Sequence, residues 1–443
     1  MTTPETQATR RVLEDLFGQP EERPFAVRLW DGSVERGRAD ARFTLVLKHA
    51  GALRRMLVPP TELSIIESYL FDDTDIEGDM EAAAALGDLV ASRLSRKHDV
   101  LRVMRHVAAL PTHDRPATTT SRAARVLQRF GRQHSRRRDR RAVQFHYDLG
   151  NDFFALFLDR RMVYSCAYFE SEGDDLDDAQ LAKLDYVCRK LRLRPGERFL
   201  DVGCGWGSLV MHAAERYGVE AVGITLSEKQ AALARERIAA AGLTGTCRVE
   251  LRDYRTLGRD APFDKAASIG MVEHVGSRKL PAYFAAVLRA LRPGGLFLNH
   301  GIVTIAGARP KSVLTRVMDR VWRRNEFIER YVFPDGVLVP SAAVVGSAES
   351  AGFELRDVES LREHYTRTLR HWIRRLEERH ERAAELVSEF TYRVWRLYMS
   401  GSAYAFDTGR IGIIQTLLAK QGPGGTVSLP RTRRDLYDER GRD

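Results

Sequence analysis

The sequence predicts an α/β fold in which helices cover both faces of a mostly parallel sheet, with a smaller α+β domain ahead of it. From Val143 onward, short apolar segments alternate with helical stretches, a pattern typical of such a sheet. The strands are expected at 199–202, 221–224, 247–251, 264–269 and 296–300. With 443 residues, of which 44% are hydrophobic, the chain can bury more than one core.

The small domain is expected over residues 25–120, after a flexible N-terminus over 1–24. Residues 25–30 alternate like a strand and lead into Asp31-Gly32, a hairpin turn signal, with another strand expected at 43–47. Helical periodicity then dominates residues 86–110. The polar N-terminus lacks the apolar core of a signal peptide, and no stretch is apolar enough to span a bilayer. A cytoplasmic protein is therefore expected.

A basic linker is expected over residues 121–142. Between Arg122 and Arg141 there are nine arginines against one aspartate, in a chain of net charge +10. Such a segment can dock on an anionic membrane surface, because each basic residue near the leaflet contributes about 1 kcal/mol. A solvated linker without a partner is the alternative.

The main domain is expected over residues 143–420, followed by a flexible tail over 421–443. An arginine-rich helical segment at 313–331 is expected to form a lid, and long helical runs are expected across 361–418. The four cysteines are widely spaced and form no zinc-type cluster, so no metal site is predicted.

A glycine-rich turn follows the first strand of the main domain, in F-L-D-V-G-C-G-W-G at 199–207. No Lys-Ser/Thr follows it, which excludes a phosphate-binding P-loop, and the next strand ends without the acidic residue of a dinucleotide site. The loop therefore favours a nucleoside ligand without a pyrophosphate. Asp201 would steady a positively charged ligand such as a sulfonium amino acid. By itself, the loop also fits an ordinary strand-to-helix turn.

Four further motifs contain more polar and aromatic residues than a core would. They are H-Y-D-L-G-N-D-F-F from His146, Y-S-C-A-Y-F from Tyr164, G-M-V-E-H-V-G from Gly270 and L-N-H-G-I from Leu298. Together with the glycine loop, in this order, they resemble the cyclopropane-fatty-acid synthase family, including its mycolic acid methyltransferase branch. The likeness extends from about residue 25 to residue 420, and D-I-E-G-D-M from Asp75 resembles the N-terminal domain of the full-length bacterial synthases.

The resemblance implies a class I Rossmann-like methyltransferase with a smaller N-terminal α+β lipid-binding domain. It implies S-adenosylmethionine as cofactor, bound by residues of several loops: Tyr164, Ser165, Asp201, Gly203, Gly205, Gly207, Thr225, Leu226, Gln230, Asp253, Tyr254 and Arg255. Thr225 and Gln230 would make the polar contacts that an acidic residue makes in other folds.

The resemblance also implies a bicarbonate ion beside the reacting carbons. Its ligands correspond to Cys166, Glu273, His300, Ile302 and Tyr365. Taken singly, Glu273 fits a helix cap, Cys166 a buried small hydrophobe and Tyr365 core filler. Methylation of an alkene leaves a carbocation, and a fixed bicarbonate would remove a proton from it without placing a free carboxylate against the cation.

The implied reaction is methyl transfer to the cis double bond of a phospholipid-bound unsaturated acyl chain, giving a 10-methylene or a cyclopropane fatty acid. The expected partners are phospholipid acyl chains and the inner face of the plasma membrane, with a homodimer as an option from the same resemblance. A nucleic-acid methyltransferase would explain the basic charge, but its base-reading motifs are missing and no nucleic-acid partner is expected. A non-catalytic lipid-binding protein is the other alternative.

Overall fold

The computed structural model describes residues 3–59, 61–93, 97–112, 149–258, 262–305, 326–333 and 336–437. The basic segment 122–141 and most of the expected lid at 313–331 lie outside these residues.

Two compact units make up the chain, and each contains segments that are distant in sequence. The first comprises Met1–Phe130, Arg309–Pro334 and Arg379–Tyr404. The second comprises Gly131–Ala308, Asp335–Glu378 and Ala405–Asp443. The expectation of one continuous domain over 143–420 is therefore wrong, because two of its segments belong to the first unit.

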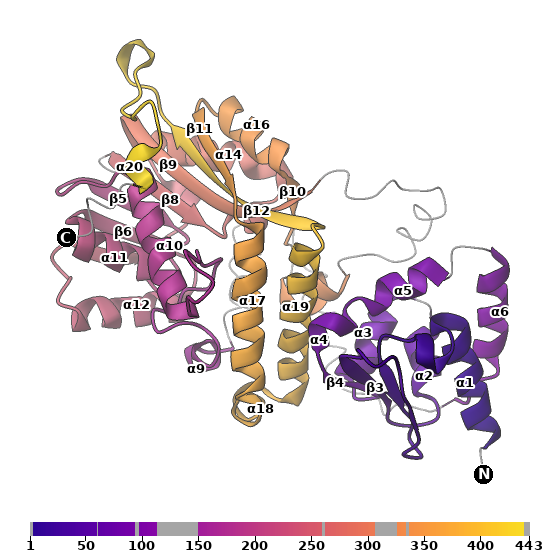
Figure 1. The fold of residues 1–443 in the computed structure, drawn as a ribbon. Helices are drawn as coiled ribbons and strands as arrows, with labels where there is room; N and C mark the ends of the chain where they lie inside the picture. Colours follow the sequence, from indigo (N-terminus) through magenta and orange to yellow (C-terminus); the bar gives the residue numbers. More distant parts are fainter. Residues whose placement is uncertain are drawn as a thin grey trace. The chain divides into compact units, whose positions relative to one another are not determined.

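An eight-stranded sheet organises the second unit, in the order β11-β12-β9-β8-β5-β6-β7, with β10 beside β9 (Figure 1). Strands β7, β6, β5, β8 and β9, which are neighbours in this order, are parallel to one another. Strand β12 runs antiparallel to both β9 and β11. The bounds are β5 Arg198–Val202, β6 Glu220–Thr225, β7 Cys247–Leu251, β8 Phe263–Ile269, β9 Leu291–Thr304, β10 Val339–Pro340, β11 Glu354–Ser360 and β12 Ile411–Ala419. The strands predicted between residues 199 and 300 are confirmed.

Helices cover both faces of this sheet, as the alternating pattern predicts (Figure 1). Successive residues of β5 enter different cores: Phe199 packs with residues of α10, α11 and α12, and Leu200 with residues of α14 and α16. This alternation places the two helical layers on opposite faces. The bounds are α10 Leu176–Leu191, α11 Ser208–Tyr217, α12 Glu228–Ala240, α13 Val272–Val275, α14 Leu280–Ala290 and α16 Ser341–Ser350.

The expected helical runs at 361–418 are correct only in part. Helices α17 (Arg362–Glu377), α18 (His380–Val387) and α19 (Glu389–Asp407) are present, but residues 411–418 lie in strand β12. Strand β12 is buried on both faces between two neighbours, so its sequence is almost continuously apolar. An apolar run of this kind has no period that separates strand from helix.

The first unit contains a four-stranded sheet in the order β2-β1-β3-β4. The predicted turn at Asp31-Gly32 joins β1 and β2, and Gly32 has a φ of 82°. The predicted strand at 43–47 is β3, which pairs with β1 in parallel. The bounds are α1 Pro4–Phe17, β1 Ala26–Arg28, β2 Val34–Glu35, β3 Phe43–Leu47, α2 Ala52–Leu57, α3 Glu62–Leu70, β4 Thr74–Gly78, α4 Met80–Ala83, α5 Leu86–Arg93 and α6 Lys97–Ala108.

Both ends of the described chain are more ordered than the sequence suggested. The expectation of a flexible segment over 1–24 is wrong, because α1 begins with Thr3 as its N-cap and buries Leu13 and Phe17. The tail after residue 420 is packed up to residue 437. Leu436 is buried there, and Asp435 pairs with Arg192.

Arginines of α19 explain why residues 379–404 belong to the first unit. Arg393 donates hydrogen bonds to the Tyr69 carbonyl oxygen at 2.9 Å and to Asp75 at 3.2 Å. Arg396 donates to the carbonyl oxygens of Ile76 and Gly78, both at 3.0 Å. The D-I-E-G-D-M motif therefore anchors α19. Among the helices that the structure describes, none has the length and apolar character needed to cross a bilayer.

Candidate functional site

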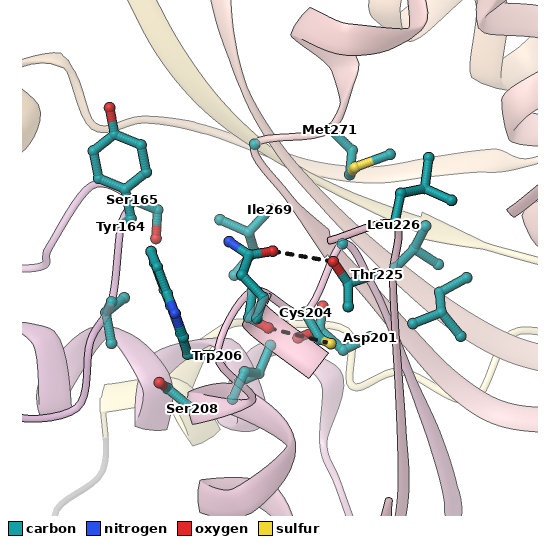
Figure 2. Close-up of a pocket in the computed structure, with 18 of the residues that line it drawn as sticks. Tyr164, Ser165, Asp201, Cys204, Trp206, Ser208, Thr225, Leu226, Ile269 and Met271 are labelled. Carbon is teal, nitrogen blue, oxygen red and sulfur yellow. Dashed lines mark hydrogen bonds between the residues drawn. The ribbon is translucent and has the colours of Figure 1, made fainter. Parts of the chain in front are cut away.

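A pocket lies in the second unit at the carboxyl ends of β5, β6 and β8, where ligands bind in sheets of this kind. Most of the residues predicted to bind the cofactor line it: Tyr164, Ser165, Asp201, Gly203, Gly205, Thr225, Leu226, Gln230, Tyr254 and Arg255. Tyr164 and Trp206 lie on one side of the pocket, and Thr225 and Leu226 on the other (Figure 2). Gly207 and Asp253 do not line it.

The glycine loop needs its glycines for two different reasons. Gly203 has a φ of 87°, and a Cβ atom there would lie 2.5 Å from Cγ of Met271, across the pocket wall. Gly207 has a φ of 81°, and a Cβ atom there would approach the Cβ of Ala234 on α12 to 3.2 Å. Gly203 therefore keeps the pocket open, whereas Gly207 lets the loop pack against a helix.

Asp253 acts through its neighbour instead of facing the pocket. Its carboxylate accepts two hydrogen bonds from the Arg255 guanidinium, at 2.8 and 2.6 Å, and a third from the Arg255 backbone N–H at 2.9 Å. This fork holds the arginine, which does line the pocket.

Thr225 and Gln230 form one hydrogen-bonded unit. The Thr225 hydroxyl donates to Oε1 of Gln230 at 3.0 Å (Figure 2). It also accepts from the Ser227 backbone N–H at 3.2 Å. Both side chains are buried. With its oxygen engaged, the Gln230 amide retains its N–H groups as donors for a ligand.

A buried acid and a buried lysine lie at the base of the pocket. Asp201 is 3% exposed, and its Oδ1 has no hydrogen-bond partner among the described residues. Burial raises the pKa of Asp201 to about 7, although Lys183 acts in the opposite direction. Burial likewise lowers the pKa of Lys183 to about 8, and its Nζ donates to the Ser165 hydroxyl at 2.9 Å.

Lys183 is a pocket residue that the sequence did not lead us to expect. A signal for Lys183 was available, because it lies on the buried face of α10 with Gln180 and Val187. A lysine on such a face is rarely buried without a partner. Trp206 donates from Nε1 to Asn151 at 2.8 Å, which gives the H-Y-D-L-G-N-D-F-F motif a role in holding the pocket wall.

None of the five predicted anion ligands lines the pocket, but Cys166 and Glu273 directly adjoin lining residues in the chain. The pocket lining includes Ser165, the residue before Cys166. It also includes Met271 and His274, on either side of Glu273 in the chain. Glu273 lies on α13, and its Oε1 accepts a hydrogen bond from the Ile302 backbone N–H at 2.7 Å. His300 lies two residues earlier on the same strand.

A series of hydrogen bonds and strand pairings connects Cys166 to these residues. The Cys166 thiol contacts the Leu361 carbonyl oxygen at 3.7 Å, and the Leu361 N–H donates to the Ile413 carbonyl at 3.0 Å. Ile413 pairs with Ile302 across β12 and β9. Tyr365 lies one turn after Leu361 on α17, where its N–H donates to the Leu361 carbonyl at 3.1 Å. The fold thus gathers the five residues on neighbouring elements.

Burial shifts each titratable member of this group toward its neutral form. Burial raises the pKa of Glu273 to about 7, although the hydrogen bond from the Ile302 N–H acts to lower this pKa. It holds the pKa of His300 well below 6.5, assisted by the positive charges of Lys183 and Lys190. It raises the pKa of the Cys166 thiol far above its usual range. A protonated carboxyl, a neutral imidazole and a thiol can all donate hydrogen bonds.

The group has unused polar atoms that fit a small anion. Glu273 Oε2 and His300 Nε2 are buried and lack hydrogen-bond partners within the described part of the chain. Such orphaned atoms are costly unless a ligand or water satisfies them. In the same part of the chain, no cluster of three or more His, Cys, Asp or Glu side chains could hold a metal ion.

Comparisons with known proteins agree on one family. A profile described as mycolic acid cyclopropane synthetase matches residues 134–416. A probable fatty acid methyltransferase of Pseudomonas putida is 39% identical over 414 residues, covering 94% of this chain and 96% of that protein. Cyclopropane mycolic acid synthase 1 of Mycobacterium tuberculosis is 40% identical over 277 residues, covering 62% of this chain and 94% of that protein.

A solved structure gives the same result. Mycolic acid cyclopropane synthase CmaA1, in complex with SAH and CTAB, superposes with a TM-score of 0.59 at 37% identity. The match covers 63% of this chain and 98% of that one. The second unit therefore has the class I Rossmann-like fold expected from the sequence.

Proposed function

Because the chain belongs to the mycolic acid cyclopropane synthetase family, we propose that it methylates the cis double bond of a phospholipid-bound unsaturated acyl chain. Family membership makes the protein an S-adenosylmethionine-dependent enzyme that methylates or cyclopropanates lipid unsaturations. The phospholipid carrier, the bicarbonate base and the methylene or cyclopropane product are the finer parts of the proposal. The buried Glu273 and His300 atoms beside the cofactor pocket are the observation that carries it.

The pocket residues fit S-adenosylmethionine. Asp201 has a buried carboxylate oxygen without a partner among the described residues, and the Gln230 amide can donate to a ligand while its oxygen accepts from Thr225. Gly203 leaves room for the ligand where a side chain would meet Met271. When bound, the cofactor supplies an electrophilic methyl group on a sulfonium. Positioning of the two reactants can contribute about 7 to 11 kcal/mol to such a reaction.

Affinity for S-adenosylmethionine is expected to rise with pH between 6 and 8. With a pKa of about 7, Asp201 is mostly protonated at pH 6, and a cationic ligand favours its ionised form. The fraction ionised changes about tenfold across this range, and the affinity should follow it. Calorimetric titration would measure this. In Asp201→Asn, the affinity should depend on pH only through the titration of the ligand and of other groups. A pH dependence equal to that of the unmodified protein would refute the role of Asp201.

The Glu273 group fits bicarbonate, which would supply a base for the proton that the acyl chain loses. Glu273 and His300 would donate hydrogen bonds to the anion from their neutral forms. Tyr365 and Cys166 would border the anion on its remaining side. Cys166 contacts the Leu361 carbonyl oxygen, and Tyr365 lies one helical turn after Leu361. Fixed neutral donors of this kind can hold an anion next to a developing cation.

Water has to be kept away from the cation, because it would trap it as an alcohol. Aromatic rings pack around the site: Tyr164 contacts Trp372 at a centroid distance of 5.2 Å, and Tyr365 contacts Phe406 at 4.8 Å. Their faces are electron-rich and can also stabilise positive charge.

The product can be identified by expressing the protein in a host rich in oleate. We expect acyl chains one methylene unit heavier than oleate, and catalytic hydrogenation followed by mass spectrometry separates the methylene isomer from the cyclopropane. Unmodified acyl chains in the presence of soluble protein and S-adenosylmethionine would count against the proposed substrate.

We also propose that the substrate is reached at the inner face of the plasma membrane, through the basic segment that begins at Arg122 and ends at Arg141. Its composition of nine arginines against one aspartate supports this. The protein is expected to bind vesicles containing anionic phospholipid and to be released by salt. Binding to DNA without binding to vesicles would favour the nucleic-acid alternative.

A further inference from the structure

Three side chains form a row across neighbouring strands of the second unit. Glu359 on β11 pairs in register with Gln415 on β12, and Gln415 pairs with His300 on β9. Residues opposite one another in adjacent strands project from the same face of the sheet. Within this row, the Gln415 amide is within hydrogen-bond distance of the His300 ring.

Lys190 of α10 fixes the orientation of the Gln415 amide. Lys190 and Gln415 are each 1% exposed, and the Lys190 ammonium donates to Gln415 Oε1 at 2.8 Å. It also pairs with Glu359, which accepts a hydrogen bond from the Tyr186 hydroxyl at 3.0 Å. A lysine ammonium can only donate, so the oxygen of the Gln415 amide must face it.

The other end of the amide consequently faces His300. Gln415 Nε2 lies 3.4 Å from His300 Nδ1, and an amide nitrogen can only donate. His300 Nδ1 must then be the acceptor, without a proton. We propose that Lys190 and Gln415 are positioning residues that hold His300 in the tautomer with its proton on Nε2.

This tautomer aims a donor at the anion site. His300 Nε2 is the buried atom that lacks a partner within the described residues, and with a proton it can donate to a bound anion. In the opposite tautomer, Nε2 would present a lone pair and repel the anion. The benefit to catalysis rests on the proposed function, whereas the tautomer itself follows from the hydrogen bonds alone.

The unmodified protein permits a direct test. Histidine labelled with ¹⁵N in the ring distinguishes a protonated from an unprotonated ring nitrogen in long-range ¹H–¹⁵N spectra. Of the 12 histidines, His300 would be assigned by the signal missing from His300→Gln. A neutral His300 protonated on Nε2 is expected at pH 7.5. Protonation on Nδ1, or on both nitrogens, overturns the inference whatever the activity.

Gln415→Glu tests the mechanism by which the tautomer is set. A carboxylate at this position accepts from Lys190 and also accepts from His300, so the ring proton should move to Nδ1. The apparent affinity for bicarbonate in dialysed, bicarbonate-depleted assays should fall about tenfold or more, the usual effect of losing a hydrogen bond to a charged group. Thr416→Val is the matched control, because Thr416 is buried on the same strand and contacts the Asn299 carbonyl instead of His300.

The outcomes separate the inference from the proposed function. If the tautomer shifts in Gln415→Glu but bicarbonate dependence does not, the positioning role stands and the assignment of His300 to the anion site fails. If His300 stays protonated on Nε2 alone in this variant, the role of Gln415 is refuted.

Discussion

Glu273→Gln is expected to lower turnover by about 10²- to 10⁴-fold, the range typical of losing acid–base catalysis. The glutamine oxygen can still accept the hydrogen bond that the Ile302 N–H gives to Glu273 Oε1, so the backbone of β9 stays in place. What disappears is the titratable group at the buried position of Oε2: an amide there can still donate a hydrogen bond to the anion, but it cannot take up or release a proton. Lipid products counted by mass spectrometry would measure the loss.

Cofactor binding should survive this substitution. Glu273 does not line the cofactor pocket, so calorimetry should give an S-adenosylmethionine affinity within about twofold of the unmodified protein. Glu349→Gln, an exposed glutamate of α16, is the matched control and should change neither quantity. Turnover at the normal rate in Glu273→Gln would remove the proposed anion site from the mechanism.

Trp372→Ala is expected to lower the free energy of unfolding by about 3 to 5 kcal/mol. Trp372 is 1% exposed on α17, and its ring packs against Phe157 at 6.1 Å, Tyr164 at 5.2 Å and Tyr365 at 6.0 Å. Truncation leaves a cavity among rings that belong to both the cofactor pocket and the anion site. Urea unfolding followed by circular dichroism would measure the stability, and calorimetry the weakened cofactor affinity.

Trp372→Phe supplies the comparison. The Trp372 Nε1 atom has no hydrogen-bond acceptor among the residues described, so a phenylalanine loses packing volume but no hydrogen bond. A smaller cost than that of the alanine variant is expected, because the remaining ring fills most of the space that Trp372 occupies. Equal costs for the alanine and phenylalanine variants would contradict the packing argument.

The cofactor loop was readable from sequence because its signals are local. A strand, a glycine turn and a helix follow one another within residues 198–217, and each glycine with positive φ lies where the motif has it. The same holds for Thr225 and Gln230, which are five residues apart and joined by one hydrogen bond. Local sequence constrains such short-range geometry strongly.

Other features depend on partners that are distant along the chain. Lys183 is a pocket residue because α10 packs beside the loop of Ser165. Asp253 was expected in the pocket, but its carboxylate turns to Arg255. Strand β12 became recognisable only when its two neighbouring strands were known.

By itself, the sequence determined the parallel α/β core, the positions of its strands along the chain up to residue 300 and the residue types of the two candidate sites. Only the tertiary structure decided that residues 379–404 pack with β4, that α1 is ordered and that Lys190 and Gln415 orient His300. The reason is physical: periodicity and turn chemistry act over a few residues, whereas a buried charge or amide is oriented by whichever distant group the fold places within hydrogen-bond reach.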